Sequence, residues 1–360
     1  MKTHGLVTAS TSDAFLPGLA HELMAAGFWS APIIIGVSGG ADSVALLLGI
    51  CDIASTQAKK PSLIVAHAQH DLRTQAGADR TFVESLAQRL GLTFLWRDLP
   101  LGDHHERHSN GVESRARELR YAFFADVAHE TGARHVVVAH TADDQAETIL
   151  HRALRGTGLA GLGGMATARE LCAGVALMRP LLQMRRETVR HYLAEIAQPW
   201  CEDHSNTDIR YARNFLRHEI LAPLAAGFYP AAAESLTRLG RQASLVAAAL
   251  ASAADHLLDI YAQRHAGGNV LLQTAALSSL DRHLVAEIFV SLWRRENWPR
   301  RDMTARHYAA LADMACAAAD MADMASLRHS AMPRRAAIDL PGGMRSRIIS
   351  AGVVEVTREN

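Results

Sequence analysis

The stretch Ile33-Ile34-Ile35-Gly36-Val37-Ser38-Gly39-Gly40-Ala41-Asp42-Ser43-Val44-Ala45-Leu46-Leu47-Leu48 decides the fold of this chain. A run of β-branched residues gives way to two glycines and then to an apolar segment, which predicts a strand, a tight turn and a helix. Glycine lets the backbone approach a ligand closely, and the unpaired N–H groups at a helix start attract anions. Residues 38–43 are therefore a candidate phosphate-binding loop.

This loop differs from a Walker A loop, which places a lysine after its glycines. Asp42 stands there instead. An acidic side chain beside phosphates makes sense mainly if it also meets Mg²⁺. A plain helix N-cap is the alternative, but a cap needs only one Ser or Asp, whereas this loop combines Ser, Gly, Gly, Asp and Ser. We therefore favour phosphate binding.

The chain has 360 residues, of which 49% are hydrophobic, and its formal net charge is zero. This length supports two domains, and the balanced charge gives no global signature of nucleic-acid binding. Four scattered cysteines lack CxxC spacing, which argues against a zinc ribbon, a disulfide framework or a sulfur-relay pair. We find no secretory leader and no apolar run long enough to span a bilayer, so we expect a cytoplasmic protein without membrane contact.

Short apolar runs alternate with helical segments from residue 32 to about residue 182. The runs that predict strands span 33–37, 62–66, 93–96, 135–139 and 175–178, and the segments that predict helices span 44–53, 79–90, 113–130, 145–155 and 186–196. This alternation predicts an α/β fold with a doubly wound parallel sheet, in which ligands bind at the carboxyl ends of the strands.

The character of the sequence changes after Pro223. Alanine-rich helical segments follow, and residues 338–356 resemble a terminal hairpin. We therefore expect a first domain of residues 1–225 and a second, smaller, mainly helical domain of residues 226–360.

Polar side chains follow two other predicted strands. His67 follows the 62–66 strand, where nucleotide contact or a structural loop is favoured over a metal site, because a strand end gives nearby histidines poor ligand geometry. Asp144 and Glu147 follow the 135–139 strand and open a helix. Acidic residues are ordinary in a first helical turn, but this strand end faces the same crevice as the glycine loop. We predict that both carboxylates reach a metal or an amine substrate.

Arginines at helical spacing form two further candidate surfaces. Arg117 lies in segment 113–121, for which ion pairs along a solvated helix face are the ordinary explanation. Arg213 and Arg217 are one helical turn apart, which suits a face that contacts phosphates and equally suits an ordinary helix between domains.

Together these segments resemble the PP-loop (N-type) ATP pyrophosphatases, and within them the tRNA(Ile)-lysidine synthases. The Ser-Gly-Gly-Ala-Asp-Ser loop alone marks the superfamily. The narrower resemblance rests on segments 67–73, 113–121, 140–148, 155–162, 179–181 and 203–217, which occur in the expected order within residues 30–220. The first of these departs from the usual His-x-Asp-His-Gly-Leu-Arg by carrying Gln69 and Asp71, so no carboxylate role falls to position 69.

The resemblance implies a role for each matched residue. The phosphates of ATP would be bound by the loop residues Ser38, Gly39, Gly40, Ala41, Asp42 and Ser43, and His67, Arg155 and Gly156 would complete the nucleotide site. Asp42 would meet Mg²⁺. Asp42, Asp144 and Glu147 would be catalytic, with Asp144 orienting the lysine ammonium or its deprotonation. Arg117, Arg213 and Arg217 would contact tRNA or the adenylate.

The implied reaction joins free L-lysine to C2 of the wobble cytidine of tRNA(Ile) with a CAU anticodon, through an adenylated cytidine. ATP and Mg²⁺ are the implied cofactors, the second domain would recognise the tRNA, and a homodimer is left open. Two alternatives stay open: another PP-loop tRNA-modifying enzyme such as a cytidine thiolase, and a non-catalytic RNA- or nucleotide-binding module. Because the sequence ends soon after the 340–343 hairpin turn, we expect no extra terminal domain.

Overall fold

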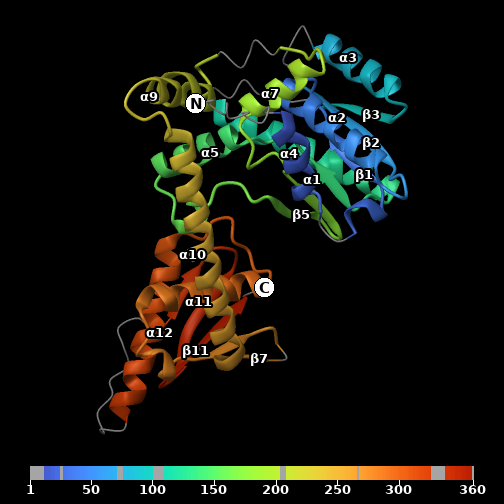
Figure 1. Ribbon diagram of the computed structural model, residues 1–360. Helices are drawn as coiled ribbons and strands as arrows, with labels where there is room; N and C mark the ends of the chain where they lie inside the picture. The colour runs from blue at the N-terminus through green and yellow to red at the C-terminus, as the bar shows by residue number, and fades with distance from the viewer. Residues whose placement is uncertain are drawn as a thin grey trace, which may run out of the picture. The chain divides into compact units, whose positions relative to one another are not determined.

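The computed structural model describes residues 12–24, 27–70, 76–99, 109–202, 208–265, 267–325 and 337–358. Figure 1 shows the course of the chain, which separates into two compact units, Met1–Ala243 and Ser244–Asn360. This division falls inside helix α10 (Ala232–Tyr261), whereas the sequence placed the boundary before that helix.

The first unit is built on a six-stranded sheet with the strand order β3-β2-β1-β4-β6-β5. Its strands are β1 (Ile33–Gly36), β2 (Leu63–His70), β3 (Thr93–Leu99), β4 (His135–Val137), β5 (Ala168–Cys172) and β6 (Val175–Met178). All neighbours are parallel except β5, which pairs antiparallel with β6. The chain moves outward on one side of β1 through β2 and β3 and then returns to β4 on its other side. The carboxyl ends of β1 and β4 thus form a topological switch point, where open α/β sheets bind ligands.

Helices cover both faces of this sheet. They are α1 (Ser12–Glu22), α2 (Ala41–Ser55), α3 (Ala76–Arg89), α4 (Ser109–Thr131), α5 (Ala142–Leu154) and α7 (Arg186–Glu195). Ile33 and Ile35 of β1 are buried in one apolar cluster with side chains of α1, α2, α3 and α7, while Ile34 is buried in another with side chains of α4. This alternation follows from the period of two residues along a strand.

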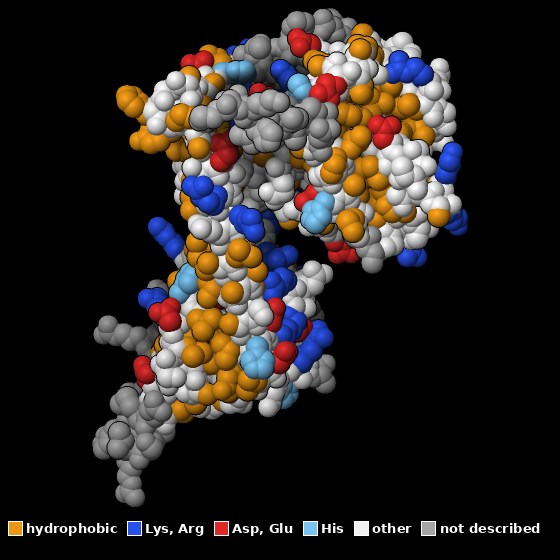
Figure 2. All heavy atoms as spheres, in the orientation of Figure 1, with side chains coloured by type: hydrophobic (Ala, Val, Ile, Leu, Met, Phe, Trp, Pro, Cys, Tyr) orange, Lys and Arg blue, Asp and Glu red, His pale blue; other side chains and the backbone are white. Residues whose placement is uncertain are grey.

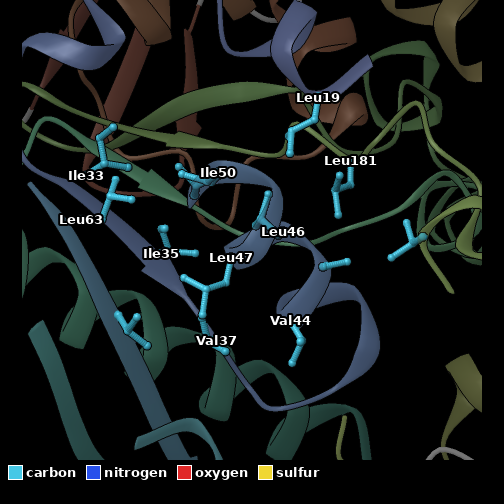
Figure 3. Packing of buried hydrophobic residues seen from close by; sticks show 14 of the residues in the cluster. Leu19, Ile33, Ile35, Val37, Val44, Leu46, Leu47, Ile50, Leu63 and Leu181 are labelled. Atoms are coloured by element: carbon cyan, nitrogen blue, oxygen red, sulfur yellow. The ribbon is translucent and has the colours of Figure 1, made fainter. Parts of the chain in front are cut away.

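The core around β1 and α2 fixes the position of the loop between them. Figure 3 shows Ile35 and Val37 beside Leu46, Leu47 and other side chains of α2. All four of these residues are at most 2% exposed. Full burial of such a side chain stabilises the fold by about 1.5–3 kcal/mol. The two ends of the glycine loop are therefore held by a rigid core.

The predicted α/β sheet is confirmed, and each predicted strand and helix of the first unit occurs with the expected type. Strand β5 was not predicted. Three of its five residues are exposed, so it lacks the apolar run that marked the other strands.

The second unit contains helices α11 (Arg282–Arg295) and α12 (Ala305–Ala325) and the end of α10. It also has an antiparallel sheet in the order β7-β8-β11-β10-β9. The predicted hairpin is present as β9 (Ala337–Leu340), β10 (Met344–Ser350) and β11 (Val353–Arg358), and it is extended by the unpredicted strands β8 (Val270–Gln273) and β7 (Ala262–Arg264). Trp293 and Trp298 pack edge to face in its core, with ring centroids 5.0 Å apart.

Helix α10 is the one described helix that is long and apolar enough, by length and composition, to cross a membrane. The sequence had predicted no such segment, because polar residues interrupt the apolar ones along this helix. Leu245 and Val246 are 63% and 49% exposed, and hydrophobic side chains gather over the helix in Figure 2. Length and composition alone do not distinguish a membrane span from a helix of a protein in water.

Candidate active site

The turn between β1 and α2 forms the predicted loop. Gly39 has a φ of +99°, a conformation that favours glycine. The buried Ser43 hydroxyl accepts a hydrogen bond from the Ser38 N–H (3.2 Å) and donates one to the Gly40 carbonyl oxygen (2.9 Å). No group in the described part of the chain accepts a hydrogen bond from the N–H of Gly39, Ala41 or Asp42. These N–H groups at the start of α2 are the donors that a phosphate needs.

His67 lies within β2, which is longer than the predicted 62–66 strand, and its side chain contacts the residue before this loop. Its Nδ1 lies 2.8 Å from the backbone oxygen of Val37, the residue that precedes the loop. Burial lowers the pKa of His67, so the ring is neutral near pH 7 and Nδ1 donates to that oxygen. His67 therefore supports the strand end from which the loop begins.

The three predicted catalytic carboxylates meet around one guanidinium group, that of Arg186 on α7. Its Nε lies 3.3 Å from Asp42 Oδ2, and its Nη2 lies 3.0 Å from Asp144 Oδ1. Its Nη1 lies 3.9 Å from Glu147 Oε1. Residues from the start of α2 and from the first turns of α5 are thus brought together at the switch point of the sheet.

Two predicted RNA-contacting arginines also belong to this cluster. Arg217 holds Glu147 with two contacts, Nε to Oε1 at 2.6 Å and Nη2 to Oε2 at 3.1 Å. Arg213 Nε lies 3.6 Å from Glu147 Oε2. Arg213 lies in α8 (Ala212–Phe215) and Arg217 in the π-helical turn η3 (Leu216–Leu221), which continues into α9 (Ala222–Ala226). Such turns are frequent at functional sites.

The electrostatics of the cluster give Asp42 and Asp144 different pKa values. Burial raises the pKa of Asp42 to about 6, although Arg186 opposes the rise. Burial would also raise the pKa of Asp144, but Arg186 and Arg213 hold it below the ordinary value. Asp144 is consequently a firmly ionised group near pH 7, whereas Asp42 titrates close to neutrality.

The orientation of Asp144 is fixed by a capping box at the start of α5. The Thr141 N–H and hydroxyl donate to Asp144 Oδ2 at 2.8 and 2.9 Å. The other oxygen, Oδ1, is thereby left to face Arg186. The local helix cap and the long-range cluster use different oxygens of the same carboxylate.

One carboxylate of the cluster has an oxygen atom suited to Mg²⁺. Asp42 Oδ1 is buried and has no hydrogen-bond partner. A buried carboxylate oxygen without a donor is costly unless a cation reaches it. Mg²⁺ is usually bound through one or two carboxylates together with substrate phosphates, so Asp42 fits this role. Within the described ranges, no three His, Cys, Asp or Glu side chains form a metal site of protein ligands alone.

Two predicted site residues, Arg155 and Gly156, lie apart from the cluster, whereas Arg117 is close enough to Arg213 for the two charges to interact. Arg155 and Gly156 follow the carboxyl end of α5, whose 13 residues place them about 20 Å along the helix axis from its start. The structure therefore does not bring them to the glycine loop. Arg117 of α4 lies over the ring of Tyr121, 5.0 Å from its centroid.

Sequence reasoning did not single out Arg186. One signal was available, because Arg185 and Arg186 occupy the N-cap and first position of α7. The helix dipole disfavours cations there, and a residue that violates a local preference often serves a site.

A six-stranded α/β sheet with a glycine loop at its switch point and carboxylates beside that loop defines a PP-loop domain. The family model described as "PP-loop domain" matches residues 19–224. A tRNA(Ile)-lysidine synthase from Rhodopirellula baltica is 35% identical over 310 residues, which are 77% of this chain and 78% of that protein. The chain belongs to the tRNA(Ile)-lysidine synthase family.

Other relatives are longer than the matched region. The chain is 37% identical to a tRNA(Ile)-lysidine synthase from Solibacter usitatus and 42% identical to one from Geobacter sulfurreducens, covering 54% and 44% of their lengths. These matches span 70% and 60% of this chain. A U34-tRNA thiolase from Methanococcus maripaludis has a similar structure, with a TM-score of 0.51 and 14% identity over 64% of this chain and 79% of that one. The last likeness shows the fold alone.

Proposed function

We propose that the chain uses ATP to join free L-lysine to C2 of the wobble cytidine of tRNA(Ile) with a CAU anticodon, which gives lysidine. The observation that carries this proposal is the convergence of Asp42, Asp144 and Glu147 beside a loop of unpaired N–H groups. The family of the chain supplies the substrate class. The N–H groups of the loop support phosphate binding, and the carboxylates beside them support binding of an amine.

In the first step, the C2 oxygen of the cytidine attacks the α-phosphorus of ATP, and pyrophosphate leaves. The N–H groups of Gly39, Ala41 and Asp42 would bind the departing phosphates and offset the negative charge that grows on them. Asp42 would hold Mg²⁺ against the same phosphates, and the ion would supply further positive charge. Adenylation converts the C2 oxygen into a good leaving group.

In the second step, the ε-nitrogen of lysine attacks C2, the C2–O bond breaks, and AMP carries that oxygen away. Asp144 would orient the lysine ammonium, because a carboxylate with a lowered pKa binds a cation better than it accepts a proton. The ammonium must lose a proton before its nitrogen attacks, and this proton would pass to solvent, since Asp42 would hold Mg²⁺. Glu147 would hold Arg217 and Arg213 in place.

The arginines of the cluster would bind anionic groups of the substrates. Three guanidinium groups, those of Arg186, Arg213 and Arg217, face the carboxylates of Asp42, Asp144 and Glu147 within 4 Å. A cationic lysine then competes with these arginines for the carboxylates, while phosphates attract the arginines. The second unit would contact the tRNA outside the reacting base.

A pyrophosphate-release assay with ATP, lysine and tRNA(Ile) tests this proposal. We expect release that requires both lysine and the CAU-containing tRNA. If the chain only bound RNA or nucleotides, no pyrophosphate would appear. If it were a thiolase, pyrophosphate release would depend on a sulfur donor instead of lysine. The four cysteines of the chain are not paired with one another in the structure.

A further inference from the structure

Arg179 is a buried cation for which the described residues supply no carboxylate partner. It follows β6 at the carboxyl edge of the sheet and is 2% exposed. Its Nη1 donates to the Ala166 carbonyl oxygen at 2.8 Å, but its Nε is buried and has no partner. Among the residues that the structure describes, no carboxylate pairs with it. A buried guanidinium of this kind is costly in free energy, so its retention at a strand end points to a ligand that brings the negative charge.

Two other groups, His140 and Arg117, are close enough to Arg179 to interact with its charge. His140 follows β4, the strand next to β6, and its Nδ1 is buried without a partner. Arg117 has an aromatic face as its contact and no carboxylate within the described residues. Burial, together with Arg179 and Arg117, keeps the pKa of His140 well below its ordinary value, against the influence of Asp144. The neutral imidazole therefore retains one N–H donor near pH 7.

We propose that Arg179, Arg117 and His140 bind a phosphodiester group of the RNA next to the base that is modified. A buried arginine fork and a neutral imidazole donor match the oxygens of a phosphate. This inference rests on the proposed function, because it takes the RNA as the source of the phosphate.

The strand order favours RNA over ATP as that source. The glycine loop follows β1, whereas Arg179 follows β6, two strands away. Neighbouring strands are about 4.8 Å apart, so the two positions are separated by about 10 Å. The loop already offers unpaired donors to the phosphates of ATP. His140 after β4 and Arg179 after β6 can therefore donate hydrogen bonds to the other substrate, the RNA.

Binding measurements with the full chain test the inference. The probes are ATP, an RNA hairpin with the CAU anticodon stem and loop, and the same hairpin with uncharged methylphosphonates on both sides of the target cytidine. We expect Arg179→Gln to weaken binding of the natural hairpin roughly 10- to 100-fold. The slope of log affinity against log salt should become shallower by about one. Affinity for ATP should not change.

The methylphosphonate hairpin identifies the group that is bound. The wild-type chain should bind it more weakly than the natural hairpin by the same factor, and Arg179→Gln should no longer distinguish the two. Arg97→Gln is the matched control, because Arg97 is an exposed arginine on another strand of the same sheet and pairs with Asp126. This variant should bind all three probes like the wild type.

A merely structural role for Arg179 would lower the melting temperature of Arg179→Gln, whereas we expect no decrease, because the variant removes an uncompensated buried charge. Should this variant not fold, Arg117→Gln should reproduce the loss of RNA affinity. Equal binding of the two hairpins by the wild type, or a loss of ATP affinity in place of RNA affinity, would overturn the inference. Failure of the wild type to bind the natural hairpin at all would contradict the proposed function as well.

Discussion

The guanidinium group of Arg186 bridges Asp42 and Asp144, with its Nε 3.3 Å from Asp42 Oδ2 and its Nη2 3.0 Å from Asp144 Oδ1. One arginine thereby links the loop that would bind phosphates to the helix that would bind lysine. Burial alone would lower the pKa of Arg186, but Asp144, Asp42 and Glu147 raise it. The guanidinium group is therefore permanently charged, and it supplies a counter-charge to these carboxylates.

We expect Arg186→Gln to reduce the unfolding free energy of the first unit by about 3 kcal/mol near pH 8, because it leaves buried carboxylates unpaired. The loss should be smaller near pH 5, since Asp42 is protonated below a pKa of about 6 and then needs no counter-charge. Urea unfolding at the two pH values measures this. Arg97→Gln, which breaks an exposed ion pair, should lower the unfolding free energy by less than about 1 kcal/mol at both pH values. An equal loss at both pH values for Arg186→Gln would contradict the account.

Asp42→Asn should not lower the melting temperature near pH 8, although it should abolish pyrophosphate release. The pKa of Asp42 is about 6 in the folded chain against an ordinary value of 3.8. Between these values the folded chain holds a proton that the unfolded chain releases, so stability from this group falls as the pH rises through the window. Asparagine cannot ionise, so the variant avoids the loss of stability that ionised Asp42 causes at high pH. Melting curves should therefore place it at or above the wild type near pH 8, and the difference should shrink toward pH 4. A lower melting temperature near pH 8 would indicate a structural role instead.

Glu147 and Arg217 should behave as one unit in a double-mutant cycle. Glu147 is 1% exposed and accepts two hydrogen bonds from Arg217. We expect Glu147→Gln and Arg217→Met each to be strongly destabilising, and the double variant to lose less than their sum by about 1–3 kcal/mol. The same cycle on the exposed pair Arg294 and Asp255 should give a coupling below about 1 kcal/mol. Additive effects at Glu147 and Arg217 would contradict the contacts described.

Gly39→Ala should weaken ATP binding by about tenfold or more, because it strains the loop whose N–H groups face the phosphates. Gly39 has a φ of +99°, and an added Cβ would lie 3.4 Å from Cys201 Sγ. Gly91→Ala is the matched control, since Gly91 has a φ of +66° and open space around it. Both variants should lose about 1 kcal/mol of stability. Calorimetric titration with ATP should separate them, and equal ATP affinities would argue against the loop as the phosphate site.

The sequence predicted the parts of this fold and site that depend on local patterns. The β-branched run before residue 38 and the glycines after it specify the strand and the loop, and the acidic turn at Asp144 follows a strand in the same way. Arg186 was not predicted as a site residue because its partner Asp42 is 144 residues away. Spacing rules extend over only one or two helical turns. The pairing of Arg217 with Glu147 depends in the same manner on the packing of distant helices.

The predictions that the structure did not support have a related cause. Arg155 and Gly156 adjoin a matched segment in the sequence, but helix α5 carries them away from the loop. Arg179 was noted only as part of a motif, since nothing in its neighbours along the chain shows that it is buried without a carboxylate. Burial and the pairing of charges become visible only in three dimensions.

Incorporation of labelled lysine into tRNA tests the central claim most directly. The chain should be incubated with ATP, Mg²⁺, radiolabelled L-lysine and tRNA(Ile) with a CAU anticodon, and the tRNA then digested to nucleosides. We expect label in a modified cytidine, dependent on ATP and absent with Asp42→Asn. Release of pyrophosphate without transfer of lysine to the cytidine would contradict it.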